Sequence, residues 1–575
     1  MKNFLKMVLA VICGILLLNA LIIAVIAGLS GGSTPSVPAE GVLKIDMSKI
    51  VIAEQSRETD PLSMIQAGGK QIVTLGIYEA VSAVNAAALD PGIKYIYLKT
   101  DGNSTDAAHL SEFRQALQNF RTSSGKAVVA YIESPSTGSY YLASVADKVY
   151  MTSHPGASSM VNGVNSKMYF LGDLLKKLGV NMQLIRHGKY KSAGEMYTRN
   201  SPSAENREQY QVMVSSMWKS LAGEIAASRS IQVDDLNAAI DGLKLCMPQD
   251  FVDCGLVDSL LDRDGLKKQL ATLAVAEKYE KVTMIPFADY TAAKVQPAVG
   301  KNKIAVIYAD GSIIDGESEE NVAGDRFASI VEKVREDKTV KAVVLRVNSP
   351  GGSVIASDKI KTELDLLGAE KPLVASYGSY AASGGYWISN NCDKIFSDAV
   401  TLTGSIGVFG LIPDFSKTAS DVLHVGVENI SSNKHGDMFG LMRPLDQAEY
   451  DYELRSIEEI YTLFTTIVSE GRDLPVERVD EIGQGRVWTG ADALEIGLVD
   501  EIGTLEDAIA YAAALAGNED VSSWNVKGYP TPPTALESMM SSINGPKEDY
   551  AVRLKKELGV AGIYARMPMN IEIVL

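Results

Sequence analysis

An internal duplication constrains the fold of this chain more than any other feature of its sequence. Apolar, strand-like runs at residues 93–98 (IKYIYL) and 340–345 (VKAVVL) each follow a helical stretch. Each half then closes on a shared tag, GLVDSL beginning at Gly255 and GLVDEIG beginning at Gly497. Self-similarity of this kind indicates two copies of one folding unit, with the boundary between them near Val295.

Within each half, short β-rich runs alternate with helical segments of ordinary length. That alternation predicts βαβ units with right-handed crossovers, in which helices cover a mainly parallel sheet. The run AVVLRV (residues 342–347) lacks polar alternation, as expected of a strand that is buried on both faces. We therefore expect an α/β fold class with tandem domains at residues 42–295 and 296–532. The tail at 533–575 ends in IEIVL, and its sequence suggests no role.

The N-terminus carries a separate signal. Residues 7–29 contain no charged side chain and are long enough to cross a bilayer as one helix. Lys2 and Lys6 precede them, which predicts a cytoplasmic N-terminus with the rest of the chain outside. A cleaved signal peptide is the competing interpretation, but the apolar stretch is long for one and no clear small-x-small cleavage site follows. We expect a retained single-pass anchor at residues 1–29 and a flexible linker at 30–41.

Composition argues against several classes of function. The chain has 575 residues and a formal net charge of −17, so it lacks the basic face of a sequence-independent nucleic-acid binder. Cys246 and Cys254 could pair in an oxidising compartment, but free buried thiols are the favoured interpretation. The four cysteines show neither CxxC spacing nor nearby histidines, so we expect no zinc site: Cys13, Cys246, Cys254 and Cys392.

Candidate chemistry gathers in three glycine-rich runs of the second half. In the run NSPGGS (residues 348–353), adjacent glycines let the backbone approach a ligand and point N–H groups at it, as in an oxyanion hole. A plain tight turn is the alternative. In AASGGYW (residues 381–387), Ser383 follows a strand between small residues, where a hydroxyl can be exposed, although a helix-capping serine is possible. The third run is TLTGSIG (residues 401–407).

The first half serves as an internal control, because its scaffold pattern remains while these residues change. Ungapped alignment places different residues at the key positions: Thr137 opposite Ser383, Gly138 opposite Gly384, and Ser104 and Thr105 opposite Gly351 and Gly352. The glycine pair and the serine are thus lost together, which a purely structural turn would not explain. We expect a single nucleophile per chain.

A serine hydroxyl needs a base to remove its proton. The five histidines stand in no recognisable triad pattern, so core or surface positions are expected for them: His109, His154, His187, His424 and His435. The run GKYKSAGE (residues 188–195) offers Lys189 and Lys191, which would face the same side of a strand. A lysine acts as a base only when desolvation or cationic neighbours lower its pKa by several units. A solvated lysine pair is the alternative.

Together, the anchor, the two repeats and the motifs SPGG, ASGGYW, TLTGSIG and YKSA-E resemble the signal peptide peptidase A (protease IV) family in its double-length form. The resemblance implies tandem domains of crotonase- and Clp-protease-like fold and a Ser/Lys dyad shared between the repeats. By motif, it implies Ser383 as nucleophile and Lys191 as general base. It also implies three supporting residues: Ser405, which positions the lysine, and Gly352 and Gly384, whose N–H groups form the oxyanion hole, with Gly351 adjacent.

The same resemblance implies what the enzyme acts on and where. Its substrates would be extended hydrophobic peptides, remnant signal peptides in particular, at the outer face of a bacterial cytoplasmic membrane. Tyr386 and Trp387, close to Ser383, would suit a hydrophobic substrate pocket. A homo-oligomer, tetrameric in long members, would enclose the sites, and neither a metal nor a cofactor would be needed.

Two departures leave alternatives open. Gly194 stands where family members often have valine, which would loosen the segment that carries the base. Lys434 is a rival base, because short members keep their lysine in the same repeat as the serine, although an ungapped register pairs Lys434 with Lys189. Lys191 remains the favoured base. Outside the peptidases, a crotonase-type acyl-CoA enzyme and a non-catalytic membrane scaffold are the competing functions.

Overall fold

The computed structural model describes most of both repeats and a few short pieces of the tail. The described residues are 14, 35–58, 72–295, 300–319, 321–534, 537, 563–567 and 572–574. The anchor expected at residues 7–29 lies outside them apart from Gly14. Within the described ranges, no helix has both the length and the apolar character needed to span a bilayer.

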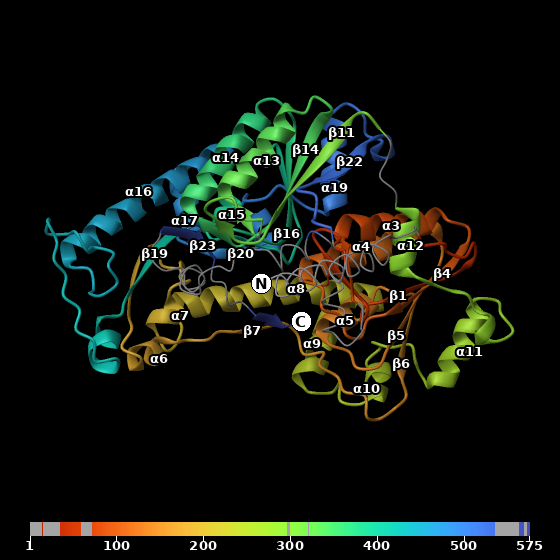
Figure 1. Cartoon of the computed structure of the whole chain (residues 1–575). Helices are drawn as coiled ribbons and strands as arrows, with labels where there is room; N and C mark the ends of the chain where they lie inside the picture. Colours follow the sequence, from red (N-terminus) through yellow and green to blue (C-terminus); the bar gives the residue numbers. More distant parts are fainter. Residues whose placement is uncertain are drawn as a thin grey trace, which may run out of the picture.

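The first repeat is built on a sheet whose neighbouring strands are all parallel. Its strands run in the order β10 (Met284–Pro286), β1 (Gly41–Asp46), β4 (Ile93–Lys99), β5 (Val128–Ile132), β6 (Lys148–Thr152) and β9 (Ser259–Leu261). The helices of this repeat include α3 (Ile77–Leu89), α4 (Ala107–Ser124), α5 (Thr137–Ala143), α6 (Gly172–Lys177), α7 (Glu195–Thr198), α8 (Ala204–Arg229), α9 (Val233–Asp241), α10 (Pro248–Asp253), α11 (Arg263–Leu273) and α12 (Phe287–Lys294). Helix α8 runs across the middle of the view, below the second repeat (Figure 1).

The second repeat has a sheet in the order β20 (Val487–Thr489), β18 (Leu402–Gly404), β16 (Leu373–Ala382), β14 (Val340–Ser349), β11 (Lys303–Asp310) and β22 (Asn525–Tyr529), with β17 (Lys394–Ser397) and β21 (Glu501–Ile502) branching from β16. Only the β18–β20 pair is antiparallel among these described strands. The helices include α13 (Gly324–Glu336), α14 (Val354–Gly368), α15 (Gly384–Trp387), α16 (Gln447–Arg472), α17 (Val476–Ile482), α18 (Gly490–Glu495) and α19 (Leu505–Leu515). The prediction of two mainly parallel sheets is confirmed.

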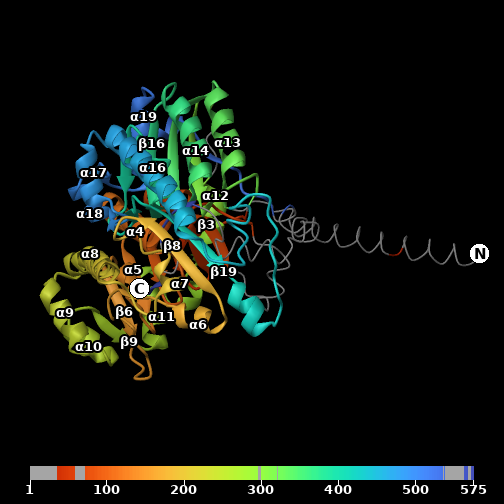
Figure 2. The same ribbon diagram turned by 90° about the vertical axis from the view of Figure 1, so that its left-hand side faces the viewer.

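A third sheet joins the repeats. Its order is β13 (Val322–Ala323), β12 (Ile313–Ile314), β15 (Gly351–Ser353), β23 (Ile563–Arg566), β19 (Val408–Asp414) and β8 (Asn181–His187). Strand β8 belongs to the first repeat, yet it pairs antiparallel with β19 of the second, from Val408↔His187 to Asp414↔Asn181. Figure 2 shows the two strands side by side. The remaining described pairs are β2 (Ile50–Ala53) with β3 (Val73–Gly76), and β7 (Asn165–Lys167) with β24 (Glu572–Val574).

The main sheet of the second repeat is buried on both faces, as its apolar sequence predicts. In β11 and β14, Ile304 and Val344 pack into a core shared with the first repeat. Their neighbours Ala305 and Val343 pack on the opposite face, into the core of the second repeat. Because side chains alternate along a strand, an uninterrupted apolar run serves both cores.

One charged side chain, that of Arg346, lies within the apolar run of β14. Arg346, on β14, is fully buried and points into the boundary between the repeats, where its Nε lies 2.7 Å from Glu54 and its Nη2 lies 2.5 Å from Glu112. His109 Nε2 lies 2.9 Å from the other oxygen of Glu54. Burial alone would raise the pKa of Glu54, but Arg346 and His109 outweigh it and hold this pKa at about 2. The repeats are therefore joined by a buried ionic cluster as well as by apolar packing.

Candidate active site

Ser383 occupies the junction between strand β16 and helix α15. Its backbone lies in the left-handed region, at φ 56° and ψ −113°, which is costly for a residue other than glycine. Its N–H donates to Gly404 O at 2.8 Å, and its side chain makes no hydrogen bond that caps α15. The alternative of a helix-capping serine is thus wrong, and the hydroxyl is free to face the first repeat.

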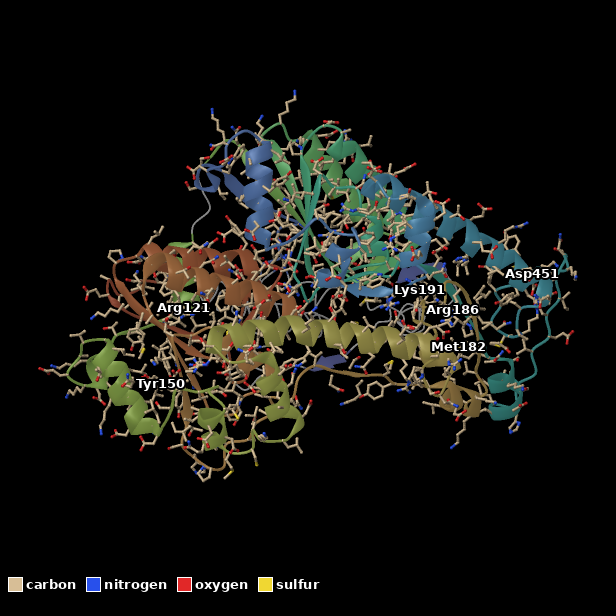
Figure 3. The ribbon with its side chains drawn as sticks, turned by 180° about the vertical axis from the view of Figure 1, so that it is seen from behind. Arg121, Tyr150, Met182, Arg186, Lys191 and Asp451 are labelled. Carbon is tan, nitrogen blue, oxygen red and sulfur yellow. The ribbon has the colours of Figure 1, made fainter. Side chains whose placement is uncertain are left out.

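The segment that carries Lys191 is a turn, and not the strand on which two same-facing lysines were expected. Strand β8 ends at His187, and Gly188 adopts φ +94°, which breaks the extended conformation. Lys189 is consequently exposed, whereas Lys191 is fully buried. Figure 3 labels Lys191 and Arg186 where the first repeat meets the second. The Tyr190 N–H donates to Gln484 O at 2.9 Å, so the turn is held directly against the second repeat.

The structure brings Lys191 and Ser383 together. Lys191 Nζ lies 2.8 Å from Ser383 Oγ, 2.9 Å from Ser405 Oγ and 2.9 Å from Ser405 O. All of these partners are neutral, and none of the described carboxylates forms an ion pair with Lys191. Burial therefore lowers the pKa of Lys191 well below its usual value. A neutral amine has two N–H donors and one lone pair, which matches two contacts to Ser405 and one to a serine proton.

Ser405 is positioned by the backbone in the same way as Ser383. It follows β18, adopts φ +50°, and donates its N–H to Arg486 O at 2.7 Å. This conformation turns its carbonyl and its hydroxyl toward the same amine. The expected nucleophile, Ser383, thus meets Lys191 and Ser405, the two residues expected beside it, in one buried group.

The glycine pair of β15 leaves space beside the nucleophile. Gly351 adopts φ +89°, and a Cβ at this position would lie 2.5 Å from the backbone nitrogen of Gly384. A Cβ at Gly352 would lie 1.9 Å from Ile313 O, in strand β12. Side chains at either position would displace backbone, so the pair is required for the close approach of β15 to the start of α15.

Two further glycines make room for the base. Gly407 ends the TLTGSIG run, whereas Gly485 lies in a segment that the sequence analysis did not single out. A Cβ on Gly485 would lie 2.5 Å from Lys191 Cβ and 2.6 Å from its Cα, and a Cβ on Gly407 would lie 3.2 Å from Lys191 Cδ. Gly485 also adopts φ +79° and donates its N–H to Ile406 O at 2.7 Å. The run GQG before a strand-like VWT was the available signal, but nothing in the sequence links it to residue 191.

Replacing Gly485 by alanine is expected to lower kcat/KM for peptide hydrolysis by about 100-fold, because the new methyl group would displace the backbone of Lys191 by a distance on the order of 1 Å. Peptide hydrolysis by the purified variant measures this. Gly517→Ala is the matched control, since Gly517 also has a positive φ, of 90°, but has open space around it. Equal activity of the two variants would show that the Gly485 contact does not position the base.

A buried polar network, also missed from the sequence, holds the turn from behind. Gln209 on α8 donates to Tyr190 O and Ser192 Oγ, each at 3.0 Å, and accepts from the N–H of Val487 at 3.3 Å. Glu195 accepts from Arg186 at 3.1 Å, and Arg186 donates to Lys191 O at 2.8 Å. The glutamate of the YKSA-E motif therefore orients the backbone of the base through an arginine.

Neither departure from the family pattern weakens this site. Gly194 is not loosely packed, since a Cβ on it would lie 2.4 Å from Leu184, so valine would not fit there without movement. Lys434 is exposed and makes no hydrogen bond to Ser383 or Ser405 within the described part of the chain.

The five histidines lie away from the dyad. His109 belongs to the buried ionic cluster, and His187 stacks on Tyr461 with ring centroids 3.9 Å apart. His154 and His424 are exposed, and His435 contacts Glu449. Among the described contacts of Ser383, none comes from a histidine, so the expectation that histidine does not form a triad agrees with the geometry.

The suggested substrate pocket around Tyr386 and Trp387 is wrong. Both side chains are fully buried in the core of the second repeat. Tyr386 donates its hydroxyl to Leu498 O at 2.8 Å, and Trp387 packs on Phe464 with centroids 4.6 Å apart. Because α15 turns back into the core directly after Ser383, its aromatic residues anchor the helix and do not line an open pocket.

The equivalent position of the first repeat differs from Ser383 in conformation. Helix α5 begins at Thr137 with Ser136 as its N-cap, so the helix starts align Ser136, and not Thr137, with Ser383. Ser136 has an ordinary φ of −91°, and its hydroxyl accepts from the N–H of Ser139. The first repeat has kept a serine there, but as a helix cap.

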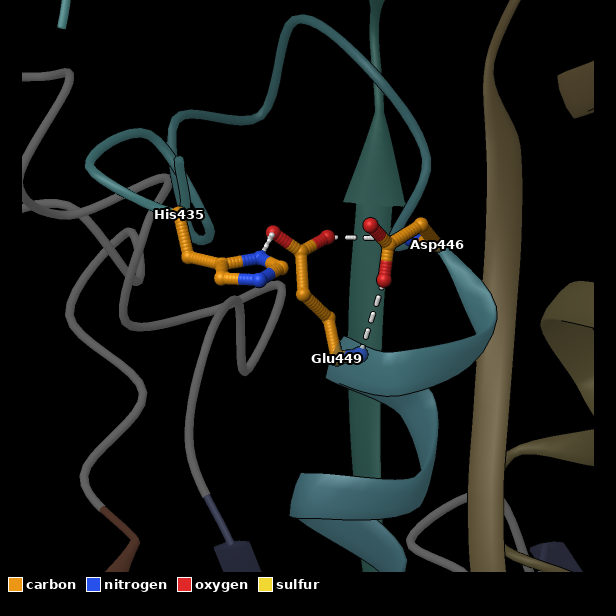
Figure 4. A group of neighbouring side chains, drawn as sticks. All are labelled: His435, Asp446 and Glu449. Carbon is orange, nitrogen blue, oxygen red and sulfur yellow. Dashed lines mark hydrogen bonds and ion pairs between the residues drawn. The ribbon is translucent and has the colours of Figure 1, made fainter. Parts of the chain in front are cut away.

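A possible metal-ligand group lies outside this site. His435, Asp446 and Glu449 place ligand atoms within 4.8 Å of one another at the start of α16 (Figure 4). Asp446 and Glu449 already accept each other's backbone N–H, at 2.9 Å each, and Arg443 lies 2.7 Å from both Glu449 oxygens. Glu449 is thus paired with an arginine, and both carboxylates are engaged in capping the helix. The described cysteines Cys246, Cys254 and Cys392 are free, as expected, but Cys246 is exposed and Cys254 is only partly buried, so the expected burial of these two thiols is wrong. Cys13 lies outside the described residues.

Comparison with known proteins is consistent with the geometry. The profile of Peptidase family S49 matches residues 121–277 and 365–519, one stretch in each repeat. Protease 4 of Haemophilus influenzae is 33% identical over 575 residues, covering 96% of this chain and 92% of that protein. Protease 4 of Salmonella typhi is 35% identical, with coverages of 90% and 84%. The chloroplastic serine protease SPPA of Arabidopsis thaliana is 32% identical, with coverages of 80% and 68%. Among solved structures, ClpP1 from Listeria monocytogenes covers 35% of the chain and 92% of its own at 14% identity, with a TM-score of 0.23, too low to support an argument.

Proposed function

The chain belongs to peptidase family S49 and is a serine peptidase, and we propose that Ser383 and Lys191 form its catalytic dyad. The single observation that carries this proposal is the separation of 2.8 Å between Lys191 Nζ and Ser383 Oγ in a fully buried setting. A neutral lysine at hydrogen-bond distance from a serine hydroxyl can act as its general base.

In the first chemical step, Ser383 donates its proton to the lone pair of Lys191 while its oxygen attacks the scissile carbonyl carbon. The two contacts to Ser405 hold the amine in place, with its lone pair directed at Ser383. The carbonyl oxygen gains negative charge, and the backbone N–H groups of Gly352 and Gly384 are the donors proposed to stabilise it. Because burial disfavours the ammonium form, Lys191 returns its proton readily.

The protonated Lys191 then gives its proton to the leaving amine, and the peptide C–N bond breaks. The first product leaves with a new amino group, and the second stays bound to Ser383 as an ester. A water molecule takes the place of the amine, Lys191 removes its proton, and the ester is hydrolysed to a carboxylic acid with Ser383 restored. One water is consumed per peptide bond cut.

We further propose that the substrates are signal-peptide remnants and that the enzyme acts as a membrane-anchored homo-oligomer, on the outer side of a bacterial cytoplasmic membrane. The support for the membrane anchor and for its orientation is the uncharged segment at residues 7–29, preceded by Lys2 and Lys6. An oligomer with enclosed sites, a tetramer in the double-length form, would admit extended peptides and exclude folded proteins.

Membership of a peptidase family argues against both competing functions, the acyl-CoA enzyme and the non-catalytic scaffold. The direct test uses the purified full-length chain. It is expected to hydrolyse a fluorogenic peptide amide and to be acylated at Ser383 by a fluorophosphonate probe, as read by peptide mass spectrometry. A chain that turns over an acyl-CoA thioester but no peptide would overturn the proposal.

Activity is expected to rise with pH. Below the lowered pKa of Lys191 the amine is protonated and cannot accept the serine proton, and above it the neutral base is present. The kcat/KM for a neutral peptide should therefore increase with pH and level off well below the pH at which an ordinary lysine loses its proton. A rate that falls steadily as pH rises would contradict a neutral lysine base.

A further inference from the structure

A strand from the C-terminal tail lies inside the third sheet, next to the proposed catalytic centre. Strand β23 pairs antiparallel with β15 on one side and with β19 on the other. On the first side, Gly351, Gly352 and Ser353 face Arg566, Ala565 and Tyr564. On the second side, Phe409 and Gly410 face Tyr564 and Ile563. β23 thus separates the glycine strand β15 from β19, and β19 in turn pairs with β8, the strand that leads to Lys191.

The register directs the Ala565 carbonyl at the glycine strand. The Met567 N–H donates to Pro350 O at 2.8 Å, so these two residues form a hydrogen-bonded pair. Hydrogen-bonded pairs recur at every second residue of an antiparallel ladder. The next pair along β15 is therefore Gly352 with Ala565, in which the Gly352 N–H faces the Ala565 carbonyl oxygen.

The same oxygen lies close to the other proposed oxyanion donor. A Cβ on Gly351 would be 2.3 Å from Ala565 O and 2.5 Å from Gly384 N, so both atoms adjoin the same face of Gly351. A Cβ on Gly384 would be 3.1 Å from Ala565 O. The Ala565 carbonyl thus adjoins the backbone of both residues that are proposed to bind the oxyanion of a substrate.

Burial shows that this strand closes the site. Ala565 is 0% exposed and Met567 is 1% exposed, and the side chains of Ser383 and Lys191 are also fully buried. Tyr564 packs against Phe409 with ring centroids 6.0 Å apart. A peptide cannot pair with β15 while β23 is there, because each strand edge accepts one partner.

We propose that residues 563–567 are a built-in pseudosubstrate, and that a peptide substrate binds by replacing β23 as the strand between β15 and β19. The tail strand therefore marks the substrate path: an extended peptide, paired through its main chain on both sides, with a small residue such as alanine at the carbonyl that faces Gly352 and Gly384. This inference rests on the proposed function for its catalytic meaning, but the occupancy of the cleft can be measured without catalysis.

A permanent structural strand is the competing explanation, and peptide binding separates the two. The probe is a fluorescent peptide of sequence GIYARMP, residues 562–568, and the protein is the full chain with Ser383→Ala, which prevents cleavage. In that background Ala565→Asp would expel the tail strand, because it places a charge at a fully buried position. The labelled peptide is expected to bind this double variant at least about tenfold tighter than Ser383→Ala alone, since an occupied cleft lowers apparent affinity. Equal binding to both, or binding to neither, would overturn the proposal.

Activity supplies the second measurement. With Ser383 intact, Ala565→Asp and Met567→Pro are each expected to raise kcat/KM at least about tenfold, mainly through a lower KM. Met567→Pro removes the N–H that bonds to Pro350 O and places no charge in the core, so it decides the matter if Ala565→Asp unfolds the chain. Thr531→Asp, at an exposed position just before the tail, is the control and should leave kcat/KM unchanged. If both tail variants are folded but no more active than this control, the pseudosubstrate role is wrong. Peptide binding without any hydrolysis would instead refute the proposed function.

Discussion

Replacing Lys191 by alanine is expected to lower kcat/KM for peptide hydrolysis by about 10³-fold or more, because general-base catalysis is worth about 10² to 10⁴-fold and no other described base contacts the serine. Ser383→Ala removes the nucleophile itself and is expected to cost about 10⁶-fold. Initial rates with a fluorogenic peptide, at a pH where Lys191 is neutral, provide the measurement. Thermal unfolding of each variant checks that the loss is chemical.

Two other lysines provide matched controls. Lys189 lies two residues from the base but is exposed, and Lys434 is the exposed rival in the second repeat. Alanine at either position should leave kcat/KM within about twofold of the parent enzyme, because exposed charges contribute little to a buried site. The double variant Ser383→Ala/Lys191→Ala should be no slower than Ser383→Ala alone, since the two residues act as a unit. An inactive Lys434→Ala together with an active Lys191→Ala would reverse the assignment of the base.

The nucleophile side of this site could be predicted from the sequence because its determinants are local. Gly351, Gly352 and Gly384 lie within short runs, and a serine between small residues after a strand already suggests an exposed hydroxyl. The base side depends on contacts across more than half the chain. Whether residues 188–191 form a strand or a turn is settled by Gln484 and Gly485, and no local pattern encodes that pairing.

The same distinction separates the predicted from the unpredicted parts of the fold. The parallel sheets follow from largely apolar runs such as that of β14, because a run without polar alternation is typical of a strand that is buried on both faces. The third sheet mixes β8, β19 and β23, which are distant in sequence, and the pairing of short strands is weakly specified by their own residues. Tyr386 and Trp387 were misassigned because proximity in sequence to Ser383 does not reveal that α15 turns into the core.

The AVVLRV run also contains the residue whose loss should be most damaging to folding. Arg346 is buried between two carboxylates of the first repeat, and it donates further to Ser376 Oγ at 2.9 Å and to Tyr377 O at 3.2 Å. Removing one partner of a buried ion pair costs about 3–5 kcal/mol, because the remaining charge is left without compensation. Arg346→Met, which keeps most of the side-chain volume, is therefore expected to lower the free energy of unfolding by about 3–5 kcal/mol.

Arg335 is the matched control for this change. It pairs with Glu370 at 3.1 Å at a site where the glutamate side chain is 53% exposed, so Arg335→Met should cost about 1 kcal/mol or less. Urea unfolding, followed by fluorescence on both variants and the parent chain, measures the difference. A cost for Arg346→Met no larger than that for Arg335→Met would mean that the buried cluster does not join the repeats.

The dependence of this cost on pH identifies its cause. In the parent chain the pKa of Glu54 is lowered from 4.5 to about 2, so its contribution to stability is present above about pH 4.5 and is lost as the pH falls toward 2. Without Arg346, burial should instead raise the pKa of Glu54, so the variant loses stability at neutral pH and regains it as acid protonates the carboxylate. The stability difference between the parent and Arg346→Met should therefore shrink between about pH 7 and about pH 4.5. A difference that stays constant over this range would point to lost packing, and not to an uncompensated carboxylate, as the origin of the effect.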